Sequence, residues 1–123
     1  MLNKLYRAEK HLNEALKMAR NNSDRRNEGR ALDSVGRLCY ALKKRDHAIE
    51  HHKKALEIAQ EIGDRWCEGN ALFDLACCYD VIGEHELAVE HAKKSLILRR
   101  QIETQQAVQV GAWLQERGMT VEG

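Results

Sequence analysis

The feature that most constrains the fold of this chain is a repeat with a period of forty residues. Residues 25–64, laid over residues 65–104, share far more identical positions than chance allows. The identical pairs are Arg25/Arg65, Glu28/Glu68, Gly29/Gly69, Ala31/Ala71, Leu32/Leu72, Ala48/Ala88, Glu50/Glu90, His51/His91, Lys53/Lys93, Lys54/Lys94, Leu56/Leu96 and Ile62/Ile102. The same shift relates residues 8–24 to residues 48–64, so we expect the chain to begin halfway through a repeat. A unit of this length buries its apolar face only by stacking on its neighbours.

Each period contains two predicted helices. Asp24 and Asp64 are suited to cap the start of a helix, and Gly83 is suited to end one. Apolar residues at helical spacing follow these signals. The chain contains no proline and is rich in strong helix formers, so we expect an all-α fold. Small residues at Gly36 and Ala48, and again forty residues later, allow the two helices of a hairpin to approach closely.

The pattern resembles the tetratricopeptide repeat, whose hairpins carry a large residue, a small residue after a leucine, a tyrosine, a glycine and two alanines. The matching residues are Leu32, Val35, Gly36, Ala48 and Ala55, and then Leu72, Leu75, Ala76, Tyr79, Gly83 and Ala88. The long period is similar to that of a subclass found in Pins-type polarity adaptors and bacterial signalling proteins. The family's tyrosine, glycine, alanine and closing prolines are replaced at Cys39, Lys43, Ser95, Gln60 and Arg100. The resemblance implies a right-handed superhelical solenoid of antiparallel helix hairpins.

We therefore expect a single domain of about two full repeats with a half-repeat helix at each end. Its parts are a half-repeat at 1–22, repeats at 24–63 and 64–103, a terminal helix at 105–118 and a short tail at 119–123.

The resemblance implies that the first helix of each hairpin lines a concave groove, which binds an extended or helical segment of a partner protein. The groove residues on this reading are Arg30, Asp33, Arg37, Tyr40, Asn70, Phe73, Cys77 and Asp80. The carboxylate clamp of chaperone-tail binders needs lysine and asparagine where this chain has Asp33, Arg37 and Asp74, so chaperone C-termini are not the expected ligand. We expect a non-enzymatic scaffold or adaptor module.

A second hypothesis is a self-associating structural piece, or a fragment of a larger scaffold protein, whose end helices stack in homo-oligomers. The opening and closing helices each lack a hairpin mate, and an exposed apolar stripe invites association. The residues of this possible interface are Leu5, Leu12, Leu16, Val110, Trp113 and Leu114.

The sequence contains no phosphate-binding loop, nucleophile elbow or HExxH motif, so we expect no catalytic residues. His11, His51 and His91 recur at the repeat period, but stacked helices lie on the order of 10 Å apart, so these three cannot share one ion. His47 and His51 form an i,i+4 pair that lacks a further ligand at the spacing of a known helix-borne site. We therefore expect neither a metal nor a cofactor.

Charge and hydropathy limit the partners. With 20 basic and 19 acidic residues and a net charge of +1, the chain lacks the positive field that favours nucleic acid. No stretch approaches the roughly 18 continuous apolar residues that span a bilayer, and no signal peptide is evident, so we expect a cytoplasmic protein without membrane contacts. The four cysteines form no C-x-x-C pair, and we expect them to be reduced thiols.

Overall fold

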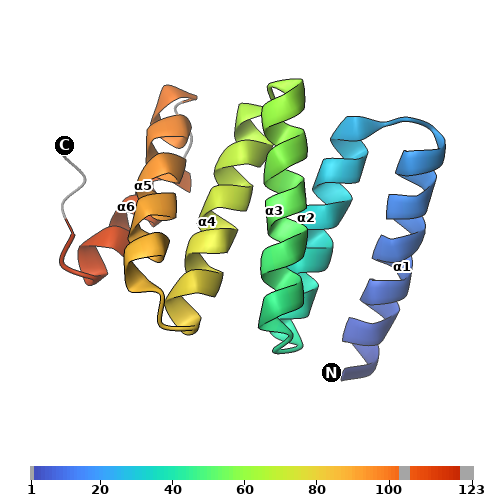
Figure 1. Ribbon diagram of the computed structural model, residues 1–123, viewed down its shortest axis with the longest axis horizontal. Helices are drawn as coiled ribbons and strands as arrows, with labels where there is room; N and C mark the ends of the chain where they lie inside the picture. Colours follow the sequence, from blue (N-terminus) through green and yellow to red (C-terminus); the bar gives the residue numbers. More distant parts are fainter. Residues whose placement is uncertain (1, 103–105, 120–123) are drawn as a thin grey trace.

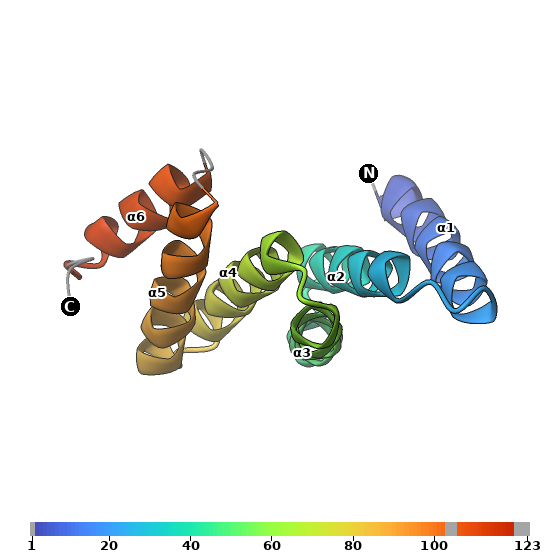
Figure 2. The same ribbon diagram turned by 90° about the horizontal axis from the view of Figure 1, so that it is seen from above.

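The computed structural model describes residues 2–102 and 106–119, with side chains for 3–102 and 108–119, and every regular element in these ranges is an α-helix. The helices are α1 (Leu2–Asn21), α2 (Arg25–Ala41), α3 (Arg45–Ile62), α4 (Arg65–Val81), α5 (His85–Gln101) and α6 (Gln106–Glu116). They follow one another in chain order along the long axis of the molecule (Figure 1). Figure 2 shows that the row is curved, with α2 and α4 on the inner side and α3 and α5 on the outer side. The expected all-α array of helix hairpins is confirmed.

The hairpins pair α2 with α3 and α4 with α5, while α1 packs on α2 and α6 packs on α5. Contacts between α3 and α4, and between α2 and α4, join the first hairpin to the second. The expected start of the terminal helix at residue 105 and the end of the tail lie outside the described residues. None of the helices in the described ranges has the length and apolar character that a membrane crossing requires.

The helix starts follow the capping chemistry expected from the sequence. The carboxylate of Asp24 accepts a hydrogen bond from the Asn27 amide, and that of Asp64 accepts one from the Cys67 amide, both at 3.1 Å. Gly63 and Gly83 follow α3 and α4 with φ of +71° and +88°, in the left-handed region that glycine enters without strain. Lys43, at the turn between α2 and α3, adopts φ of +63° without that freedom.

Small residues bring the two helices of each hairpin close together, as the sequence predicts. Ala48, Ala76 and Ala88 are fully buried, and the last two lie in apolar clusters that join α4 to α5. At Gly36 an added Cβ would lie 2.6 Å from the ring of His52, which is shorter than any normal contact. The imidazole of His52 therefore occupies space that exists only because residue 36 has no side chain.

The ends of the array differ from the expected self-association surface. Val110 and Leu114 are fully buried in a cluster with Ala92 and Leu96 of α5, because α6 packs its apolar face on its own chain. Leu16 is also buried, in contact with residues of α2 and α3. Contrary to the expectation, these three residues are not part of an exposed apolar stripe. The other three residues of that surface, Leu5, Leu12 and Trp113, are half-buried.

Candidate functional site

The groove residues expected from the sequence lie on α2 and α4, the two helices on the inner side of the curve (Figure 2). Arg30, Arg37 and Tyr40 are exposed. The other five are half-buried: Asp33, Asn70, Phe73, Cys77 and Asp80.

Most of these residues line one or both of two neighbouring cavities. The first has a volume of about 270 Å³ and is lined by Arg30, Asp33, Arg37 and Asn70 together with Trp66, which the sequence did not single out. The second, of about 190 Å³, is lined by Arg37, Tyr40, His52, Asp74, Cys77 and Cys78. Arg37 lines both cavities, so the two hollows adjoin at its side chain.

Phe73 and Asp80 lie outside these two cavities and support α6 instead. The ring of Phe73 meets Trp113 edge-on, with centroids 5.8 Å apart. Asp80 accepts a hydrogen bond from Arg117 at 2.5 Å, and this bond is the main reason why the pKa of Asp80 is lowered. The guanidinium of Arg117 in turn lies over the Trp113 ring, 3.8 Å from its centroid. Both residues therefore help to hold the terminal helix in place.

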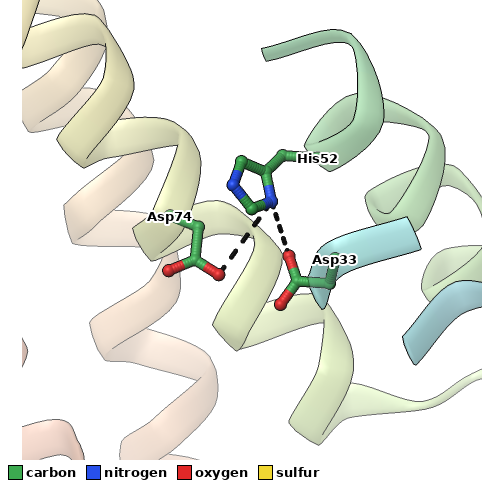
Figure 3. A group of neighbouring side chains, drawn as sticks. All are labelled: Asp33, His52 and Asp74. Atoms are coloured by element: carbon green, nitrogen blue, oxygen red, sulfur yellow. Dashed lines mark hydrogen bonds and ion pairs between the residues drawn. The ribbon is translucent and has the colours of Figure 1, made fainter. Parts of the chain in front are cut away.

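Three polar side chains from three helices meet where the first hairpin joins the second: Asp33 of α2, His52 of α3 and Asp74 of α4 (Figure 3). The Nδ1 atom of His52 lies 2.7 Å from Asp33 Oδ1 and 4.0 Å from Asp74 Oδ2. The guanidinium of Arg37 donates to Asp74 Oδ2 at 2.9 Å and lies 3.7 Å from the Asp33 carboxylate. His52 is 1% exposed, whereas the side chain of Arg37 is 58% exposed, so solvent reaches the cluster from the side of Arg37.

The electrostatics of this cluster are governed by two carboxyl groups that share a partly buried space. Burial, together with the charge of Asp33, raises the pKa of Asp74 to about 7. Burial also acts to raise the pKa of Asp33, but the hydrogen bond and charge of His52 outweigh it and lower that pKa. The Asp74 carboxyl is therefore partly protonated near neutral pH.

The corresponding junction one repeat later, between the α4–α5 hairpin and α6, has none of these three polar side chains. The positions forty residues after Asp33, His52 and Asp74 are Phe73, Ala92 and Leu114, and these three belong to one apolar cluster. The fold therefore forms this kind of junction with apolar residues at all three positions.

Asn70 is held by a second polar network inside the α4–α5 hairpin. Arg99, which is 5% exposed, donates to Asn70 Oδ1 at 2.5 Å and to the Ser95 hydroxyl at 3.1 Å. The Ser95 hydroxyl donates to the Gly69 carbonyl at 2.7 Å. Burial lowers the pKa of Arg99. The signal in the sequence was the departure from the repeat, because the positions of Ser95 and Arg99 carry alanine one period earlier.

The cysteines offer no reactive thiol at the groove. All four are free in the structure, as expected. Burial raises the pKa of Cys77 to about 11 and that of Cys78 to about 12, so both thiols are protonated at neutral pH and are poor nucleophiles.

Paired helices stacked in a curved row, with small residues at each crossing, define a helical repeat protein. The tetratricopeptide repeat model matches residues 2–61 and again residues 45–101, and the chain belongs to this family. Such repeats generally mediate protein–protein interactions. No curated protein matches the chain.

Proposed function

We propose that this chain is a non-catalytic interaction module that binds a peptide or helical segment of a partner protein along α2 and α4. The observation that carries the proposal is the pair of adjoining cavities on the inner side of the curve. Trp66 and Tyr40 are 41% and 38% exposed beside them, and large apolar side chains that are not used in packing are suited to anchor a partner. The forty-residue period supports placing the chain in the long-period subclass that includes Pins-type adaptors.

Arg30 supplies a charged contact for such a segment. It is exposed, lines the first cavity, and enters none of the ion pairs formed among the described residues, whereas nearby Arg26 is paired with Asp64. A carboxylate of the bound segment would pair with Arg30 without breaking an ion pair formed among the described residues.

The test begins by selecting, from a displayed random library, peptides that bind the wild-type chain. The selected peptides are then titrated against the wild-type chain and its variants. Arg30→Ala and Trp66→Ala are expected to weaken binding by at least about tenfold, as truncation of interface anchors does. Lys54→Ala, on the outer helix α3, is the matched control, because the ion pair that Lys54 forms among the described residues is with the exposed Glu50. Peptides that bind all variants with equal affinity would place the site elsewhere.

A second candidate function is end-to-end self-association, and a specific observation favours it. A cavity of about 330 Å³ near the first end is lined by Leu12, Ala15 and Met18 of α1 together with polar residues of α2, and one of about 670 Å³ near the other end is lined by Val89 and Met119 together with six polar or charged residues. Because α1 matches the sequence of α3 and α5, α1 of a second copy is the kind of helix that would pack beside α6. Light scattering over a range of concentrations tests this candidate, since Met18→Glu and Leu12→Glu should each abolish any mass above that of a monomer.

A further inference from the structure

We propose that Asp33, His52 and Asp74 form a binding site for a divalent metal ion of the Zn²⁺ class. The site adjoins the peptide groove proposed above, since Asp33 lines the first cavity and His52 and Asp74 line the second, but metal binding at it does not depend on peptide binding. The histidines that recur with the repeat predict no metal site, but the fold brings together a different set, of which only His52 is a histidine.

The donor set suits the ion. One imidazole nitrogen and two carboxylate oxygens form a combination that Zn²⁺ and related ions bind while keeping positions open for water or a further ligand. No two of the three donor atoms lie more than 4.8 Å apart. They come from three different helices, so the packing of the hairpins fixes their arrangement (Figure 3).

The spacing needs little adjustment. Donor atoms about 2.1 Å from a tetrahedral ion lie about 3.4 Å from one another. The Asp33–His52 pair, now at 2.7 Å, has to open slightly, and the His52–Asp74 pair, now at 4.0 Å, has to close slightly. Each change is less than about 1 Å, which rotation of an aspartate side chain supplies.

The ion also has a path to the site and space for water. The cavity of about 190 Å³ reaches both His52 and Asp74, and the exposed side chains of Arg37 and Tyr40 stand at its edge. A cavity of this size holds the water molecules that would complete the coordination of the ion.

Arg37 is the natural competitor of the ion. Its guanidinium now lies against both carboxylates, and adding a divalent cation beside it would leave an uncompensated positive charge. Because the side chain of Arg37 is 58% exposed, it can swing into solvent and leave two carboxylates to neutralise one divalent ion. The proposal therefore requires that removing the charge of Arg37 strengthens metal binding.

The second junction shows that packing does not require the donor set. Phe73, Ala92 and Leu114 occupy the corresponding positions and form an apolar cluster. Two partly buried carboxylates beside a buried imidazole are costly to desolvate, and a bound cation would offset that cost.

The test is calorimetric titration of the whole chain with Zn²⁺, after treatment with a chelator, supported by Co²⁺ absorption spectra. The wild-type chain is expected to bind one ion. His52→Ala and Asp74→Asn should each weaken binding by at least about tenfold. Arg37→Met, which keeps the bulk of the side chain without its charge, should strengthen binding by at least about tenfold.

Two variants control for other ligands. His47→Ala disrupts the i,i+4 histidine pair, whose member His51 donates a hydrogen bond from Nδ1 to the His47 carbonyl oxygen 2.7 Å away. Cys77→Ser removes the half-buried thiol that lines the second cavity. Both should bind Zn²⁺ as the wild type does, and the Co²⁺ spectrum should lack the near-ultraviolet band of a thiolate ligand.

Circular dichroism checks that each variant keeps its helices. If His52→Ala does not fold, the affinity of Asp74→Asn for Zn²⁺ provides the test. Absence of binding by the wild-type chain would overturn the proposal. So would undiminished affinity in folded His52→Ala or Asp74→Asn, or loss of binding in His47→Ala or Cys77→Ser, because the ion would then be held elsewhere.

Discussion

At the scale of single residues, Gly36 and His52 depend on each other. The imidazole lies where a Cβ on residue 36 would stand, 2.6 Å from the nearest ring atom. One repeat later the corresponding pair is Ala76 and Ala92, and both are fully buried. Compared with the second hairpin, the first therefore lacks a methyl group on its first helix, at Gly36, and has an imidazole in place of a methyl group on its second helix, at His52.

This exchange predicts a strong coupling between the two positions. Gly36→Ala alone should lower the free energy of unfolding by about 1–3 kcal/mol, because overpacking a filled core forces side chains to move. In the His52→Ala background the same change should be nearly neutral, since it recreates the pair found in the second hairpin. Urea denaturation of the four proteins of the cycle measures the coupling. Additive effects would show that the ring does not occupy this space.

The contacts of His52 mark the limit of what the sequence could predict. The small side chain at position 36 was expected to permit a close helix crossing, and it does. That it accommodates His52, and that His52 meets Asp33 and Asp74, could not be predicted, since these contacts join residues 16, 19 and 22 positions apart on three helices. The departures from the repeat at these positions were visible, but their meaning appears only once the helices are stacked.

At the scale of helices and turns, the first full repeat has Lys43 where the second has Gly83. The turn after α2 requires a left-handed residue there, and Gly83 fills the same place after α4. A non-glycine residue in this conformation is disfavoured by about 1–2 kcal/mol. Lys43→Gly should therefore raise the free energy of unfolding by about 1 kcal/mol, and Gly83→Lys should lower it by a similar amount. Thermal denaturation of both variants checks the pair, and a loss of stability in Lys43→Gly would contradict the argument.

The cap of α4 predicts a dependence on pH. Burial acts to raise the pKa of Asp64, but hydrogen bonds from Cys67 and the charge of Arg26 outweigh it and hold the pKa below the ordinary 3.8. A group whose pKa is lower in the folded state stabilises the fold above its unfolded pKa, and this contribution is lost as the pH falls through the folded value.

The Asp64→Asn variant isolates this effect, because asparagine caps a helix as well as aspartate but does not titrate. Between pH 5 and strongly acidic solution, the wild-type chain should lose more stability than the variant, with the difference developing below about pH 4. Urea denaturation at a series of pH values measures both proteins. Parallel losses over this range would mean that Asp64 is not held in its charged form by folding.

At the scale of the whole molecule, the forty-residue repeat was enough to predict the architecture. The arrangement of the site residues became visible only in the structure. Each hairpin has to stack on the next, so the period and its helix caps were sufficient to predict all-α hairpins in a row. The ends were harder, because a terminal helix has no neighbouring repeat to compare. The sequence showed the apolar side of α6 but not that Val110 and Leu114 would bury it against α5.

Leu75 provides the test of how the array holds together. It is fully buried and forms a cluster with Tyr79 and Ala88, against which Ile49 and Leu56 of α3 and Trp113 of α6 also pack. Leu75→Ala should lower the free energy of unfolding by about 2–5 kcal/mol, as other fully buried leucines do. Because the cluster joins both hairpins, the loss should appear in one transition seen equally by helical circular dichroism and by tryptophan fluorescence. Leu87→Ala, at a side chain 38% exposed, is the matched control and should have little effect. Separate transitions for the two probes, or equal losses in both variants, would show that the hairpins unfold independently of this contact.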